Sequence, residues 1–206
     1  TITKIDAHAF QGCINLRKVN IPESVTSIGI YAFSGCLRLT EITIPESVTT
    51  IQDYAFYTCA SLRQINLPPS VKKIGHGAFM DCRSLEEIII PFGVTRIASC
   101  TFEFCDKLRT VSLPSTVTSI GYGAFSDCIS MESIVIPRSV TTLGAGVFSY
   151  CKSLTTVTFL GDLKSVGSNL FDHCPAISYL VIPQGRKAHF TALLNNSRYA
   201  AMLLEQ

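Results

Sequence analysis

The composition of this 206-residue chain excludes two large classes of function. Hydrophobic residues make up 47% and charged residues 16%, with a formal net charge of only +2. The 17 lysines and arginines are interspersed with 15 acidic residues, so the concentrated positive patch that nucleic acid requires is absent from the sequence. No apolar run approaches the roughly 18 residues that span a bilayer, and the opening TITKIDAHAF lacks the pattern of a secretion signal.

Three residue types recur with a period of 23, which predicts a repeat protein. The phenylalanines are Phe10, Phe33, Phe56, Phe79, Phe102, Phe125, Phe148 and Phe171. The cysteines in phase with them are Cys13, Cys36, Cys59, Cys82, Cys105, Cys128, Cys151 and Cys174. The prolines are Pro22, Pro45, Pro68, Pro91, Pro114, Pro137 and Pro183, with Leu160 as the exception. Such regularity without insertions indicates stacked, equivalent coils.

A single coil contains two strand-like segments and a tight turn. Val19 and Ile21 alternate with polar residues as in a half-buried strand, and Pro22 ends that strand because it has no N–H to donate. A second short inward-facing pair follows. Phe33 and Cys36 then face inward at a helix-like or 3₁₀-like spacing. Because one coil cannot bury its own apolar face, it must stack on its neighbours.

The predicted fold is therefore an α/β solenoid, a right-handed superhelix of about eight 23-residue coils that stack about 4.8 Å apart. A parallel sheet is expected on one face, and short strands with 3₁₀ or helical turns on the other. Residues 1–183 form the repeat domain. Ile2 and Ile5 match Val25 and Ile28 of the next coil, so we expect further repeats or a cap upstream.

The period is lost after Pro183, and residues 184–206 are predicted to form a C-terminal helical cap. The apolar residues expected to close the core are Phe190, Leu193, Leu194, Met202 and Leu203. The sequon Asn195-Asn196-Ser197 in this segment matters only in a glycosylating secretory pathway.

The unit L-x-x-I-x-I-P-x-S-V-T-x-I-G-x-x-A-F-x-x-C, clearest in residues 39–59 and 108–128, resembles the BspA-like (Treponema-type) leucine-rich repeat. The resemblance extends from Ile2 to about Ile182. Where typical leucine-rich repeats have an asparagine ladder after the strand, this chain has Ser24, Ser47, Ser70, Gly93, Thr116 and Ser139. Hydroxyl groups are therefore expected to satisfy the turn. The resemblance implies a secreted or surface-anchored protein.

The nine cysteines do not predict a metal site. One cysteine per coil places the sulfur atoms in a line, whereas zinc needs four converging ligands. The parallel Cα–Cβ vectors and aliphatic surroundings favour free buried thiols over disulfides. Cys100 lies outside the ladder, in the column of Tyr31 and Tyr54, and is the predicted reactive thiol.

No set of residues predicts an enzyme or a bound cofactor. The histidines His8, His76, His173 and His189 fall in different columns and are expected at the surface rather than in one site. The chain has no G-x-S-x-G elbow and no glycine-rich phosphate loop.

The outward columns of the predicted sheet carry the candidate site. In one column Arg63, Glu86, Arg109 and Glu132 alternate in sign, which predicts a solvated charge ladder that fixes coil order. Another column becomes apolar toward the C-terminus. The candidate protein-binding residues are Ile89, Val135, Thr156, Thr158, Tyr179 and Val181. The alternative, that the C-terminal cap folds over them, stays open.

The predicted function is a non-enzymatic surface or secreted binding module, for adhesion or for recognition of a host or matrix protein. The solenoid shape supports binding, and the surface location comes from the resemblance. The alternative is an intracellular protein–protein interaction scaffold of the same fold, because unpaired thiols suit a reducing compartment.

Overall fold

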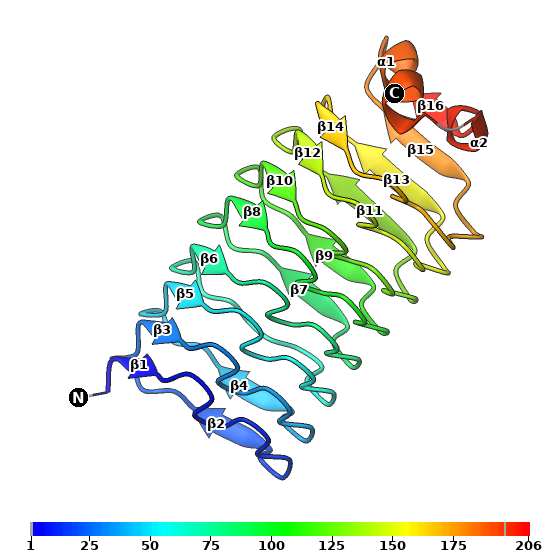
Figure 1. Ribbon diagram of the computed structural model, residues 1–206. Helices are drawn as coiled ribbons and strands as arrows, with labels where there is room; N and C mark the ends of the chain where they lie inside the picture. The colour runs from blue at the N-terminus through cyan, green and yellow to red at the C-terminus, as the bar shows by residue number, and fades with distance from the viewer. Residues whose placement is uncertain (1, 196) are drawn as a thin grey trace.

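The computed structural model describes residues 2–195 and 197–206, and in it the chain winds into a solenoid of about nine stacked coils of 23 residues (Figure 1). The predicted solenoid is confirmed. Asn196, the central residue of the sequon, lies outside the described residues.

Two rows of short strands run along the solenoid, and most coils contribute a strand to both. The first row, which we call the sheet face, contains β2 (Lys18–Asn20), β4 (Glu41–Thr43), β7 (Glu87–Ile89), β9 (Thr110–Ser112), β11 (Ser133–Ile136), β13 (Thr156–Phe159), β15 (Tyr179–Ile182) and β16 (Leu203–Glu205). The second row contains β1 (Lys4–Ile5), β3 (Ser27–Ile28), β5 (Thr50–Ile51), β6 (Lys73–Ile74), β8 (Arg96–Ile97), β10 (Ser119–Ile120), β12 (Thr142–Leu143) and β14 (Ser165–Val166). Paired strands are parallel with partners one period apart, as for Lys18↔Glu41.

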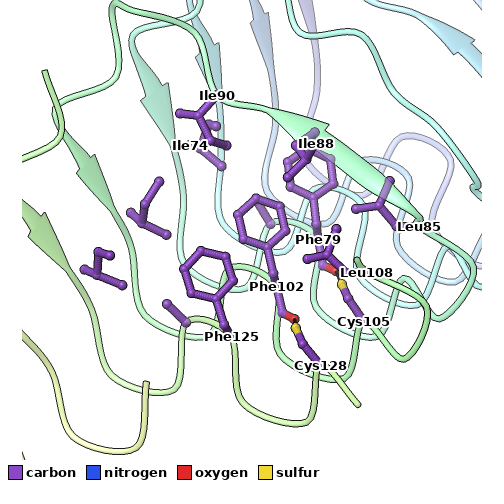
Figure 2. Close-up of a cluster of buried hydrophobic side chains, with 14 of the residues drawn as sticks. Ile74, Phe79, Leu85, Ile88, Ile90, Phe102, Cys105, Leu108, Phe125 and Cys128 are labelled. Carbon is purple, nitrogen blue, oxygen red and sulfur yellow. Dashed lines mark hydrogen bonds between the residues drawn. The ribbon is translucent and has the colours of Figure 1, made fainter. Parts of the chain in front are cut away.

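Stacked phenylalanine rings form the centre of the core. From Phe10 to Phe171, neighbouring ring centroids lie 5.1–5.9 Å apart and the ring planes deviate by at most 8°. Figure 2 shows Phe79, Phe102 and Phe125 in this stack. From Phe10 to Phe148, the backbone N–H of each phenylalanine in the stack also donates to a carbonyl of the next coil, as from Phe33 to Ala55 at 2.8 Å. Ring stacking and backbone bonding therefore reinforce the same register.

The cysteine ladder runs beside the phenylalanine stack. From Cys36 to Cys174, each thiol donates to the carbonyl of the phenylalanine 26 residues earlier, at 2.9–3.3 Å. All nine cysteines are free in the structure. Burial raises the pKa of Cys36 and Cys174 to about 11, and raises the pKa of the thiols between them further. These cysteines thus act as hydrogen-bond donors as well as small core residues.

Hydroxyl groups replace the asparagine ladder, as the sequence predicts. Ser47 Oγ donates to the Val25 carbonyl at 2.6 Å, and Ser139 Oγ donates to the Val117 carbonyl at 2.6 Å. Each bond links a turn to the coil before it. Gly93 holds this position in one coil and has no hydroxyl to donate to Val71.

Both strand rows are interrupted between the coil that contains residues 64–66 and the coil that follows it, and the sheet face alone is interrupted again between β9 and β11, which do not pair. The strand expected at residues 64–66 is not formed, and β6 does not pair with β8. Gly93 lies at this same junction. A hollow of about 180 Å³ separates residues 64–67 from residues 87–89, and Gln64 Nε2 crosses it to Glu87 at 3.1 Å. The phenylalanine stack continues unbroken on the other side, with Phe79 and Phe102 5.6 Å apart.

The C-terminal segment covers the last coil. Helices α1 (Lys187–Leu194) and α2 (Ser197–Ala200) confirm the predicted helical character. Phe190 is fully buried with its ring 5.3 Å from that of Phe159, and the Tyr199 ring meets the edge of Phe171. The strand β16, by contrast, was not predicted. It pairs in parallel with β15, with Leu203 opposite Leu180, because the period of 23 resumes there.

Removal of one ring from the stack should destabilise the chain strongly. We expect Phe102→Ala, which leaves a ring-sized cavity in a close-packed interior, to lower the free energy of unfolding by about 3–5 kcal/mol in urea denaturation followed by circular dichroism. Phe92 is 68% exposed, so the matched change Phe92→Ala should alter the free energy of unfolding by less than about 0.5 kcal/mol. Equal losses in the two variants would contradict the role of the stack.

The buried thiols should make the fold sensitive to alkali. A thiol in the unfolded chain ionises at about pH 8.5, whereas the buried ladder thiols stay protonated in the folded protein. Above that pH, unfolding therefore releases protons, and a rise in pH favours the unfolded state. We expect stability to be constant from pH 6 to 8 and to fall from about pH 9 to 11. The loss should reach about 1.4 kcal/mol per pH unit for each such thiol.

This pH dependence can be measured by urea denaturation under reducing conditions. Cys128→Ala removes one buried thiol and should make the alkaline decline shallower than in the wild type. Stability that stays constant up to pH 11 would contradict the raised pKa values.

Candidate functional site

The candidate residues lie on the outer surface of the sheet face, where alternate side chains point away from the core. In β11 the burial alternates from residue to residue, so Ser133 and Val135 are exposed while Ile134 and Ile136 are buried. β15 has a similar alternation, with Tyr179 exposed and Leu180 buried. The outward column therefore contributes nothing to the core and is free for contact.

The strand register joins most of the candidate residues into one patch. Val135 pairs with Thr158, Thr158 with Val181, and Val181 with Leu204. In the neighbouring column, Thr156 pairs with Tyr179. We call this surface the C-terminal sheet patch, and it consists of Val135, Thr156, Thr158, Tyr179, Val181 and Leu204.

Leu204 is the member of this patch that the sequence analysis missed. It lies on β16 and is 47% exposed. Its position 23 residues after Val181 was the signal in the sequence that places it in the same outward column. Ile89, in contrast, is 71% exposed on β7, in the two-stranded sheet that β7 forms with β9. Ile89 is thus separated from the C-terminal sheet patch by Ser112.

The C-terminal segment leaves the patch open. Val135 is 51% exposed and Tyr179 is 52% exposed, so the alternative that the cap folds over them is wrong. The physical reason is that Phe190 and Leu203 are buried at the open end of the core. β16 pairs with β15 as the last strand of the sheet and does not cross the sheet's outer surface.

The predicted charge ladder does not form. Arg63, Glu86, Arg109 and Glu132 are exposed, and within the described residues none of them makes an ion pair. Long exposed side chains lose mobility and hydration when they pair, which offsets the attraction. The ion pair on this face lies one column away, where Lys18 Nζ is 2.9 Å from Glu41, and the hydrogen bond with Glu41 raises the pKa of Lys18.

The prediction that Cys100 is a reactive thiol is wrong. Its residue is only 7% exposed, and burial, together with the Glu103 carboxylate, raises the pKa of Cys100 to about 12. A thiol with this pKa stays protonated and poorly nucleophilic near neutral pH. Cys13 is the exposed cysteine of the chain.

The histidines lie apart, as the sequence predicts. His8 stacks on Tyr31, His173 stacks on Tyr150, and His189 bonds the Leu163 carbonyl at 2.7 Å. In the described ranges, no three His, Cys, Asp or Glu side chains gather so that they could hold a metal ion. No helix in residues 2–195 or 197–206 is both long enough and apolar enough to cross a membrane.

Comparison with known proteins defines the class first and then the family. The chain shares its fold with bacterial leucine-rich repeat proteins, and the BspA type leucine rich repeat region matches residues 1–105 and 72–198 in six copies. The chain therefore belongs to the BspA-type leucine-rich repeat family, whose members are typically non-catalytic repeat proteins. A search of curated proteins found no match.

Three solved structures illustrate the relationship. A leucine-rich repeat protein of Treponema pallidum has 30% identity and a TM-score of 0.65, and the match covers 95% of this chain and 78% of that one. One from Bacteroides ovatus has 26% identity and a TM-score of 0.53, covering 88% and 60%. A leucine-rich cell surface protein of Faecalibacterium prausnitzii has 26% identity and a TM-score of 0.50, covering 95% and 67%.

Thiol labelling should distinguish Cys13 from Cys100. In the native protein at pH 8 we expect one of the nine cysteines, the exposed Cys13, to react rapidly with Ellman's reagent, and the others to react only in denaturant. Cys13→Ser should abolish the rapid phase and Cys100→Ser should preserve it. Loss of the rapid phase in Cys100→Ser would contradict the burial of that thiol.

Proposed function

We propose that the chain is a cell-surface binding module that holds a host or matrix protein on its C-terminal sheet patch. The observation that carries this proposal is the continuous outward row of Val135, Thr158, Val181 and Leu204 beside Tyr179. When a partner binds to a row of apolar and aromatic side chains on a rigid sheet, apolar surface is buried and the sheet loses little conformational entropy.

The anchor of the proposed interface is Tyr179. Tyr179 is 52% exposed, its register partner on β13 is Thr156, and Thr158 lies two residues further along the same strand, so its neighbours on β13 have short side chains. Tyrosine is among the residues that contribute most to protein–protein interfaces. Ile89 lies in the same outward column, two coils before Val135 and four coils before Val181, and provides a second apolar contact for a ligand that extends along the solenoid.

The surface location rests on the family and its relatives. The Faecalibacterium prausnitzii protein, which shares 26% identity with this chain, is described as a cell surface protein. The free thiols do not oppose such a location. From Cys36 to Cys174 the ladder cysteines are buried, so oxidants reach them poorly, and their raised pKa values keep them protonated.

An intracellular scaffold of the same fold is the alternative, and cell fractionation separates the two. We expect trypsin applied to intact cells that produce the full-length protein to remove it, while a cytoplasmic marker is spared. Protection of the protein from trypsin until the cells are lysed would favour the scaffold.

The binding role can be tested with purified matrix proteins. The chain should bind at least one member of an immobilised matrix-protein panel, and Tyr179→Ala should weaken that binding about tenfold or more because it removes the central aromatic anchor. Thr43→Ala changes the outward column in the N-terminal half and should alter the affinity less than about twofold. Equal affinities of these two variants, or no binding by the wild type, would overturn the proposal.

A further inference from the structure

The turn side of the solenoid contains a groove that is independent of the sheet face. It lies in the loops that follow β8, β10, β12 and β14 (Figure 1) and encloses about 410 Å³. Its lining includes the two glycines Gly123 and Gly146 and the three aromatic residues Phe104, Tyr122 and Tyr150. We call it the turn-face groove.

The groove exists because one column of residues changes character along the chain. Every member of this column has a left-handed backbone with φ between 53° and 61°, and its members are His8, Tyr31, Tyr54, Gly77, Cys100, Gly123, Gly146 and Asn169. In the N-terminal half the rings of Tyr31 and Tyr54 stack 4.8 Å apart and fill the space. The Tyr54 ring extends over the next coil, where a Cβ on Gly77 would lie 2.5 Å from it.

In the C-terminal half the same column is nearly empty. A Cβ built on Gly123 would meet nothing closer than the Cys100 sulfur at 3.7 Å. The absence of side chains at Gly123 and Gly146 lets a ligand approach the backbone closely. The flanking aromatic groups remain accessible, with Tyr122 59% exposed and Tyr150 41% exposed.

The charge in the groove is negative. Glu103, Asp127 and Asp172 line it, and no lysine or arginine does so among the described residues. Glu103 and Asp127 have no basic partner in the described ranges. The negative charge also affects Asp106 nearby. Burial raises the pKa of Asp106, and the carboxylates of Asp81 and Asp127 raise it further, while Arg83 lowers it.

Basic groups adjoin the groove at its two ends. Lys152 and Arg198 line a separate hollow together with Asp172 and His173, and His173 Nε2 is 3.7 Å from Asp172. Arg83, near the other end, is bound to Asp81 at 2.7 Å. Glu103 and Asp127 are therefore the carboxylates that an external cation would meet.

The dimensions favour a chain molecule over a single ion. Glu103 and Asp172 occupy the same column three coils apart, which is roughly 14 Å at about 4.8 Å per coil. An extended peptide covers that length with about four or five residues. Two of the serine hydroxyls in the lining are already engaged, since Ser126 Oγ donates to Asp127 and Ser149 Oγ donates to the Asn169 carbonyl. The groove also presents carboxylates and aromatic side chains, and both kinds of group attract cationic side chains.

We infer that the turn-face groove binds an extended basic peptide segment of a partner protein, with lysine or arginine side chains beside Glu103 and Asp127 and its backbone over Gly123 and Gly146. This surface and ligand are separate from the protein contact proposed for the sheet face, so the two can fail independently.

A short labelled peptide tests this inference on the whole chain. The probe is a fluorescein-labelled peptide of about eight residues with alternating lysine and serine, and its counterpart carries glutamate in place of lysine. We expect the lysine peptide to bind with a Kd on the order of 10 µM at low salt and to weaken as salt rises, while the glutamate peptide does not bind.

The column supplies a matched pair of variants at one position. Gly123→Tyr should fill the groove as Tyr54 does and weaken binding about tenfold or more, whereas Gly123→Asn should preserve it. Both side chains occur in this column with the same left-handed backbone, at Tyr54 and Asn169, so both variants should fold. Asp127→Asn should weaken binding about threefold or more, and Glu46→Gln, which removes an exposed charge elsewhere, less than about twofold.

Three outcomes would overturn the inference. One is equal binding of the lysine peptide by Gly123→Tyr and Gly123→Asn. Another is equal binding of the lysine and glutamate peptides. The third is displacement of the lysine peptide by neutral chitohexaose, which would show that the groove prefers a glycan.

Discussion

Strict 23-residue register between coils is the constraint on which the rest of this structure depends. The phenylalanine N–H of each coil donates to a carbonyl one coil further on, and the cysteine thiol of that coil donates to a phenylalanine carbonyl of the coil before. Both bonds are buried, so an insertion of one residue would leave several unsatisfied polar groups in the core. The same constraint aligns the phenylalanine rings and holds the strands in parallel.

The sequence predicted the core well because core positions repeat. The phenylalanine column and the cysteine column are each occupied by one residue type, and residues such as Phe33 and Cys36 identify the phase of the repeat directly. The C-terminal cap was also predicted from its apolar residues. β16 was missed because a loop with two helices separates Leu203 from the last regular coil, although the period itself is preserved.

Surface chemistry was harder to predict because columns do not fix the environment of each member. Cys100 shares a column with Tyr31 and Tyr54, yet its small side chain lies below the surface and next to Glu103. The expected ladder from Arg63 to Glu132 depended on the flexible ends of long side chains, which sequence spacing does not determine. The candidate sheet residues, by contrast, follow backbone alternation, and their outward direction could be predicted. The interruption of the strands at residues 64–66 had no such periodic signal.

The interruption near residues 64–66 has a mechanical consequence. On the strand side of that junction the pairing of β6 with β8 is absent, while the stacked rings of Phe79 and Phe102 remain in contact on the other side. A rod joined along one side bends most easily about that side, so the phenylalanine stack acts as the axis of flexure. We therefore expect the solenoid to bend more easily at this junction than where both strand rows are paired. A partner that spans this junction on the sheet face would meet a surface whose curvature can adjust there.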